Sequence, residues 1–197
     1  MALTKSVFYN GVEVGKHIST GDVEKDIEIA SRMIKDKGVA SEITLVDAIL
    51  RQARSFGFAT QLIFESGLTK SPHNPNCVMP FVVNGVFSIE LYLKCLGQIN
   101  GQNLTGHRLL KLYGKLPQEV HELIASNLDK FAQLCELDKP NFTEYLKKIS
   151  DAFIKWRYAY EQERTGTIYV SELIVVIQTL DEVCKISKHN KTFLTER

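Results

Sequence analysis

The spacing of apolar side chains along the chain predicts a protein built almost entirely of helices. Apolar positions recur every three or four residues over residues 41–66, 81–98 and 170–188, which is the period of an α-helix with one buried face. The same period predicts a helix that includes residues 145–160. A run of cap residues, Ser19-Thr20-Gly21-Asp22, and the stop at Gly38 predict a helix over residues 23–37, and further helices are expected over residues 107–116 and 117–135, where Pro117 suits a first turn. The expected fold class is therefore all-α, most simply an up-and-down antiparallel helical bundle.

Only the beginning of the chain departs from the helical pattern. Residues 7–9 and 12–14 flank Asn10-Gly11, the dipeptide that best accepts the positive φ angles of a tight hairpin turn. An isolated hairpin is marginally stable in water, so we expect it to pack on the main body. The predicted organisation has three parts, which are a hairpin with a short helix over residues 1–40, a helical bundle over residues 41–188 and a polar tail over residues 189–197.

Composition adds few constraints on function. The chain has 197 residues, of which 44% are hydrophobic and 24% charged, and these values are typical of one soluble globular domain. The formal net charge of +1 gives no long-range attraction to nucleic acid or to an anionic membrane. The first residues lack the pattern of a signal peptide, and no apolar run of membrane-spanning length stands out. We therefore expect a cytoplasmic protein that has no membrane partner.

The cysteines give no sign of a metal or redox site. No two of them are close in sequence, which predicts four thiols in a reducing compartment, at Cys77, Cys95, Cys135 and Cys184. No histidine has a partner at metal-ligand spacing, so no metal is assigned. The chain also lacks a phosphate-binding GxxxxGK[ST] loop, a GxGxxG turn and a GxSxG elbow, and we expect no cofactor.

Charged residues inside otherwise apolar helices are the best candidates for a functional site. Glu90 and Lys94 are four residues apart, in the order that favours an ion pair along a helix, and Arg157 and Glu161 have the same spacing. A charge among apolar residues needs a partner, because burying it alone is costly. The two pairs either solvate a helix face or meet each other, with Arg157 bound to Glu90 as a structural clasp or as part of a ligand site.

Several polar and aromatic residues complete the list of site candidates. His107 follows Gly106 at the expected start of a short helix, where a histidine is more often a cap or a satisfied polar contact than a catalyst. The candidates for catalysis are His107, Arg157 and Glu161. The candidates for ligand binding are Glu90, Lys94, His107, Trp156, Arg157, Tyr160 and Glu161.

Three segments of the chain resemble one known family. Residues 83–94 look like the second helix of HEPN-type domains (higher eukaryotes and prokaryotes nucleotide-binding), which often carry Glu-x-x-x-Lys in an apolar helix. Gly106-His107-Arg108-Leu109 is similar to the Gly-His-x-Leu of the next element in such domains. Residues 156–161 resemble a Trp-Arg-Tyr-x-Tyr-Glu stretch of bacterial relatives. The resemblance covers residues 41–188 and rests on the order and spacing of these segments.

The resemblance implies a four-helix up-and-down bundle that tends to form a homodimer. Its nuclease members cut RNA at the dimer interface with an Arg-x(4–6)-His motif near the end of the domain. Here neither Arg157 nor Arg164 is followed by a histidine at that distance. The imidazole that would serve as general acid or base is therefore absent from its usual place, unless His107 replaces it in space.

Three hypotheses for function follow. The first is a non-catalytic HEPN-like module that binds a nucleotide, RNA or a protein partner, in a bacterial defence or toxin–antitoxin system. The second is a divergent, metal-independent RNase in which Arg157, Glu161 and His107 meet at a dimer interface. The third is a structural dimerisation protein, whose charged residues set the register of the bundle.

Overall fold

The computed structural model describes most of the chain, and it divides the chain into two compact units. The described backbone covers residues 3–9, 11–39, 43–157 and 167–195. The side chains of residues 154–157 and 192–195 lie outside this description. The two units are Met1–Ile43 and Thr44–Arg197.

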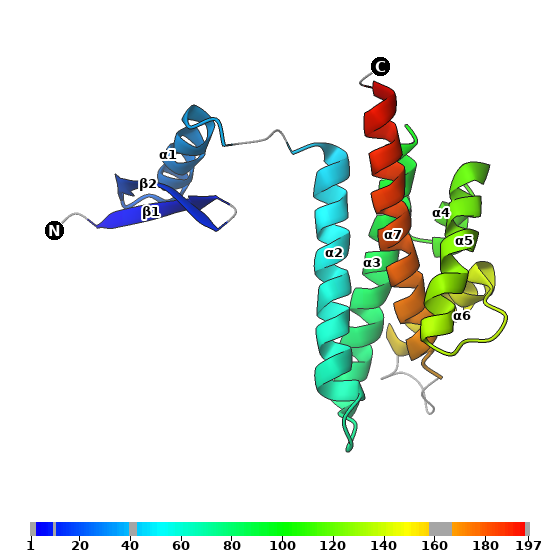
Figure 1. Ribbon diagram of the computed structural model, residues 1–197. Coiled ribbons are helices and arrows are strands. Elements are labelled where there is room, and N and C mark those ends of the chain that lie inside the picture. The colour runs from blue at the N-terminus through cyan, green and yellow to red at the C-terminus, as the bar shows by residue number, and fades with distance from the viewer. Residues whose placement is uncertain (1–2, 10, 40–42, 158–166, 196–197) are drawn as a thin grey trace. The chain divides into compact units, whose positions relative to one another are not determined.

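The first unit is a hairpin with one helix, as predicted (Figure 1). Strands β1 (Thr4–Tyr9) and β2 (Val12–Ile18) pair antiparallel, and helix α1 (Val23–Asp36) follows them. Gly11 has a φ of +80° in the turn, a conformation that glycine adopts without strain. Since Asn10 lies outside the described residues, its predicted part in the turn remains a prediction.

A buried carboxylate holds this small unit together. Asp26 of α1 is only 5% exposed, and it accepts hydrogen bonds from Lys5 Nζ at 2.7 Å and Ser19 Oγ at 2.7 Å. The amide and the hydroxyl of Thr20 donate to its other oxygen, at 2.7 and 2.8 Å. The hydrogen bond from Lys5 is the largest of the causes that hold the pKa of Asp26 far below its ordinary value. The carboxylate therefore links the start of β1 to the loop and the helix that follow β2.

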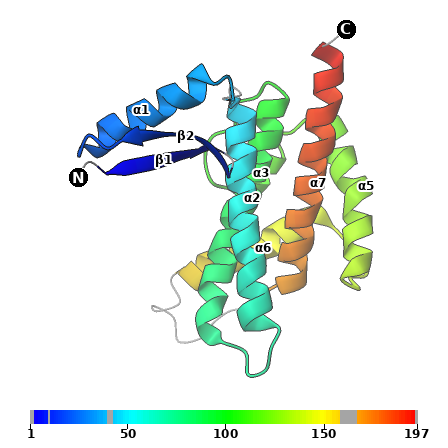
Figure 2. The same ribbon diagram turned by 60° about the vertical axis from the view of Figure 1, so that its left-hand side comes forward.

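The second unit is the predicted helical bundle (Figures 1 and 2). Its helices are α2 (Leu45–Ile63), α3 (Val78–Ile99), α4 (Leu109–Tyr113), α5 (Gln118–Leu134), α6 (Phe142–Arg157) and α7 (Val170–Thr195). A π-helical turn, Phe64–Leu68, and a short 3-10 turn, Pro75–Cys77, connect α2 to α3. Helix α3 packs against α2, α6 and α7, and α5 packs against α7. The core is thus centred on α3, the helix that carries Glu90.

Helix α3 is apolar on almost every side because other helices surround it. The segment Pro75–Ile99 is long and apolar enough to span a membrane by length and composition, which our inspection of the sequence did not anticipate. Half of its most apolar window is buried inside the bundle, however, and burial among neighbouring helices gives a core helix the same composition. A Cβ added to Gly85 would lie 2.5 Å from Leu173 Cδ2, so α7 approaches α3 closely at this residue.

Several predicted helix boundaries were wrong, among them three near the candidate site or the end of the chain. Helix α3 begins at Val78, ahead of Pro80, because a proline in the first turn gives up no helical hydrogen bond. Helix α4 spans only Leu109–Tyr113, so His107 precedes it. The chain from residue 189 is not a separate tail, because α7 continues to Thr195.

A polar cluster links three helices at the edge of the core. Asp181 of α7 accepts hydrogen bonds from Arg54 Nε of α2 at 2.7 Å and from the Tyr92 hydroxyl of α3 at 3.1 Å. Lys185 pairs with its second oxygen at 2.7 Å. Burial alone would raise the pKa of Asp181, but hydrogen bonds from Lys185 and Arg54 outweigh it and lower the pKa. Burial also raises the pKa of Tyr92, so its hydroxyl remains a donor.

Candidate functional site

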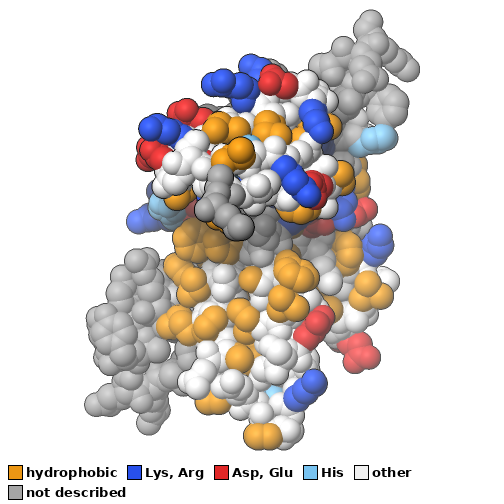
Figure 3. Space-filling view, turned by 90° about the vertical axis from the view of Figure 1, so that its left-hand side faces the viewer, with side chains coloured by type: hydrophobic (Ala, Val, Ile, Leu, Met, Phe, Trp, Pro, Cys, Tyr) orange, Lys and Arg blue, Asp and Glu red, His pale blue; other side chains and the backbone are white. Residues whose placement is uncertain are grey.

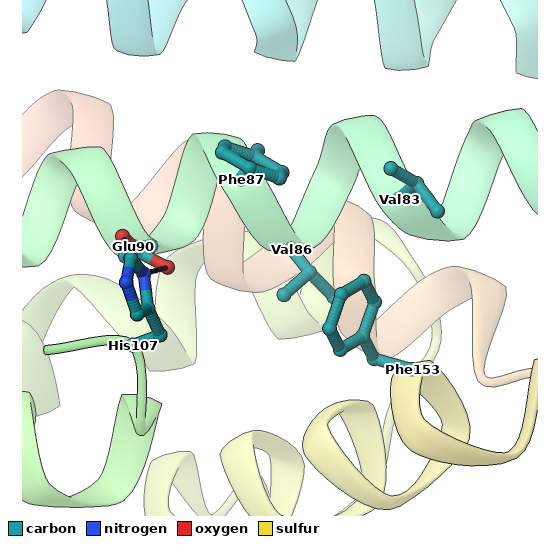
Figure 4. Close-up of a pocket in the computed structure, with 6 residues that line it drawn as sticks. All are labelled: Val83, Val86, Phe87, Glu90, His107 and Phe153. Atoms are coloured by element: carbon teal, nitrogen blue, oxygen red, sulfur yellow. Dashed lines mark hydrogen bonds and ion pairs between the residues drawn. The ribbon is translucent and has the colours of Figure 1, made fainter. Parts of the chain in front are cut away.

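Glu90 is the centre of the candidate site. Glu90 lies on α3 and is only 7% exposed, and two basic groups share its carboxylate. Lys94 Nζ, one helical turn later, donates to Glu90 Oε1 at 2.7 Å, which confirms the predicted pair. His107 Nδ1 lies 3.0 Å from Oε1 and 3.2 Å from Oε2 (Figure 4). The structure therefore brings together three of the predicted site residues, and the buried carboxylate is not left unpaired.

The loop before α4 presents His107 to Glu90. Gly106 has a φ of +94°, which a residue with a Cβ rarely adopts, and this turn directs the chain back toward α3. Arg108 occupies the cap position of α4 with an extended backbone, so His107 stands outside the helix. The His107 side chain is 81% exposed. One nitrogen of the ring therefore faces a buried carboxylate, while the ring as a whole is open to solvent.

A pocket of about 470 Å³ lies against this pair. Two helices and the loop contribute its lining, which consists of Val83, Val86, Phe87, Glu90, His107 and Phe153. Figure 4 shows Val86 of α3 and Phe153 of α6 pointing toward each other beside the polar pair. We call this space the Glu90 lobe. It combines apolar walls with a few convergent polar groups, the usual composition of a small-molecule site.

A second space of about 520 Å³ adjoins the first, and we call it the second lobe. The two lobes share Val86, His107 and Phe153. The other residues that line the second lobe are Arg108, Leu109, Leu110, Lys111 and Ser150. The pocket is therefore larger than the polar pair alone suggests, and it extends along α4 and α6.

The remaining predicted site residues fall where the structure gives no side chains. Arg157 is the last residue of α6, but its side chain and that of Trp156 lie outside the description. Tyr160 and Glu161 lie outside the described residues altogether. The predicted contact between Arg157 and Glu90 therefore stays a prediction. The described partners of Glu90 are Lys94 and His107.

Sequence reasoning missed the apolar part of the pocket. Phe153 has the helical spacing of a core residue, and nothing in that spacing places it beside a polar pair. Val83, Val86 and Phe87 likewise follow the pattern of a buried helix. An available signal was the aromatic residue Phe87 three positions before Glu90, since residues three apart share a helix face. Phe87 is 42% exposed, although most of α3 is buried.

The arrangement of Glu90 and His107 suits hydrogen bonding and proton transfer. When the imidazole proton is on Nδ1, this nitrogen donates to Glu90 and leaves Nε2 as an acceptor. A carboxylate that orients an imidazole in this way is a common feature of general bases. Among the described residues, no group of three metal-ligating side chains could hold an ion, and the four cysteines are free thiols.

Comparison of the chain with protein-family models, with curated proteins and with solved structures gave no match.

Proposed function

We propose that residues 41–188 form a HEPN-like, cytoplasmic binding module, and that the Glu90 lobe holds a nucleotide, either free or as a unit of RNA. The observation that carries the proposal is the convergence of Glu90 and His107 on a pocket with aromatic walls. The carboxylate accepts hydrogen bonds from the exocyclic amino groups and ring N–H groups of a base. Phe87 and Phe153 offer apolar faces on which a base can stack.

The size of the pocket and the net charge of the chain support a small ligand rather than a long nucleic acid. A volume of about 470 Å³ is within the range of small-molecule sites. The formal net charge of +1 provides little general attraction to a phosphate backbone. A protein partner remains the third form of the hypothesis, and the experiment below distinguishes it.

Isothermal titration calorimetry of the full chain with AMP, GMP, CMP, UMP and short single-stranded RNA tests the proposal. We expect binding to at least one mononucleotide, and His107→Ala should weaken it about fivefold, since one hydrogen bond from the base to His107 Nε2 contributes about 1 kcal/mol. His73→Ala is the matched control, because His73 is exposed and lines neither lobe. Absence of heat with every nucleotide and RNA up to millimolar concentration would refute nucleotide binding and leave a protein partner as the alternative.

We also propose that two copies of the chain associate through the face formed by α2 and α3. Figure 3 shows hydrophobic side chains gathered on the surface of the bundle on this side. The exposed large hydrophobic residues of these helices are Leu45, Phe58, Leu62 and Phe87, with exposures between 42% and 65%. Exposed large apolar side chains gathered on one side of a protein are typical of an interface. Light scattering that gives a monomer mass at every concentration up to 100 μM, taken as roughly the upper limit for a biologically useful dimer, would refute the association.

One observation favours a second function, a divergent metal-independent RNase. The exposed His107 imidazole, oriented by a buried carboxylate, has the geometry of a general base. We expect such an enzyme to cleave RNA in the presence of a chelator and to lose activity in His107→Ala, with His73→Ala as the control. RNA that stays intact from pH 5 to pH 9, a range of roughly two pH units on either side of neutrality, would exclude this function.

A further inference from the structure

The second lobe has an apolar floor and a positively charged rim. Val86, Leu109 and Phe153 give it hydrophobic surface, and Leu109 is only 2% exposed. Arg108 and Lys111 stand at its edge, and both are exposed. No acidic residue lines this lobe among the residues that the structure describes.

The two cations of the rim lack acidic partners within the described part of the chain. Neither Arg108 nor Lys111 forms an ion pair with a described carboxylate, whereas Lys94 and Lys185 do so elsewhere in the bundle. Glu90, the acidic residue of the neighbouring lobe, is already shared by Lys94 and His107. The edge of the second lobe therefore carries positive charge that no described side chain neutralises.

We infer that the second lobe binds an organic anion, with the apolar body of the ligand on the hydrophobic floor and its anionic group at Arg108 and Lys111. The apolar floor gains free energy from burying a ring or a chain, and the cations favour a carboxylate, sulfonate or phosphate over a neutral head. The inference rests on the proposed binding function, because both lobes share Val86, His107 and Phe153. It adds the charge and the shape of the ligand.

A pair of fluorescent probes separates the two halves of this proposal. The anion 8-anilinonaphthalene-1-sulfonate and its neutral counterpart N-phenyl-1-naphthylamine have the same aromatic body and differ in the sulfonate. We expect the full chain to bind the sulfonate more tightly than the neutral probe. The preference should decrease as salt is added, because ions screen the exposed charges of the rim. Equal affinities for the two probes would overturn the anion half of the proposal.

Two variants locate the probe site. Ser150→Leu places a larger side chain in the lobe and removes no hydrogen bond, because Ser150 Oγ has no partner among the described residues. We expect it to weaken both probes at least tenfold. The exposed Ser126→Leu on α5 is the control, since Ser126 lines neither lobe. Unchanged sulfonate binding in a folded Ser150→Leu protein would overturn the proposal.

The charge variant tests the rim without altering the floor. The double variant Arg108→Gln and Lys111→Gln should weaken the sulfonate probe by about four- to twenty-fivefold, at about two- to fivefold for each exposed charge. The neutral probe should bind as before. Lys115→Gln is the control, because Lys115 is exposed on the same segment and does not line the lobe. If Ser150→Leu fails to fold, this variant still decides the result, and equal effects on the two probes would overturn the proposal.

Competition identifies the source of the anion. Displacement of the sulfonate probe by AMP supports both the inference and the proposed nucleotide site. Displacement by dodecanoate but by none of AMP, GMP, CMP and UMP supports an acyl anion in the second lobe and contradicts a nucleotide that reaches this lobe, whereas the calorimetry decides nucleotide binding in the Glu90 lobe. If neither dodecanoate nor any of these nucleotides displaces the probe at millimolar concentration, the lobe does not bind natural organic anions of these two kinds and the inference fails.

Discussion

The hydroxyl of Tyr92 provides the sharpest test of how the helices of the bundle are held together. It is a buried donor on α3, at 2% residue exposure, and it reaches Asp181 Oδ1 of α7 at 3.1 Å. Tyr92→Phe removes this hydrogen bond and leaves the aromatic ring in place. Hydrogen bonds to charged groups contribute about 1.5–3 kcal/mol. The distance is long for an O–H···O bond and Arg54 still pairs with Asp181, so we expect a loss of about 1.5 kcal/mol.

Variants of the other members of the cluster should lose more or less unfolding free energy than Tyr92→Phe. Asp181→Ala removes the acceptor shared by Tyr92, Arg54 and Lys185, and we expect it to cost about 2–3 kcal/mol. Lys185→Ala removes a cation whose side chain is 51% exposed, and such pairs contribute about 0.5 kcal/mol. The expected order of destabilisation is therefore Asp181→Ala, then Tyr92→Phe, then Lys185→Ala.

Urea unfolding followed by far-ultraviolet circular dichroism measures these differences. The slope of the unfolding free energy against urea concentration should not change, because each variant exposes a similar surface on unfolding. A loss of 1.5 kcal/mol corresponds to a decrease in Tm of roughly 3–6 °C for a domain of this size. Tyr145→Phe is the matched control, since Tyr145 is 5% exposed and its hydroxyl makes no hydrogen bond among the described residues. If Tyr92→Phe is no more destabilising than this control, or if Lys185→Ala costs more, the proposed role of the cluster is wrong.

Three further outcomes are expected. The pKa values of Asp47 and Asp181 lie below their ordinary value of 3.8 in the folded chain, because Lys188 and Lys185 respectively donate hydrogen bonds to them. Both carboxylates therefore contribute their full stability above pH 3.8, and this contribution is lost as the pH falls through the lowered pKa values. Equal free energies of urea unfolding at about pH 5 and pH 3 would contradict this. Asp26→Asn should destabilise only the first unit, because it weakens the hydrogen bonds that this carboxylate accepts. We expect faster tryptic cleavage within residues 1–43 and an unchanged melting temperature of the bundle, and equal cleavage rates in the variant and the original chain would contradict this role of Asp26. Cys77 and Cys135 are half-buried, whereas Cys95 and Cys184 are buried. A thiol reagent should therefore modify the first two in the native chain and the other two only in denaturant, and reaction of all four at one rate would disprove this difference in burial.

The helices and their caps were predictable because they depend on residues that are close in sequence. The N-cap of α1 is Asp22, within the predicted run of caps, and α1 ends just before Gly38, whose φ is +65°. The Glu90–Lys94 pair was predictable for the same reason, since one helical turn separates the two residues. Errors arose at helix ends, as in α7, whose continuation to Thr195 was not predicted from its polar composition.

The amino-acid sequence by itself determined which residues share a helix face, because the helical period places them there whatever surrounds the helix. Only the tertiary structure decided which faces meet. It brought His107 back over 17 residues to Glu90, placed Phe153 of α6 beside Val86 of α3, and joined Asp181 to Tyr92. These contacts depend on how loops turn and how side chains fill the space between helices, and neither is encoded in the periodicity of one segment.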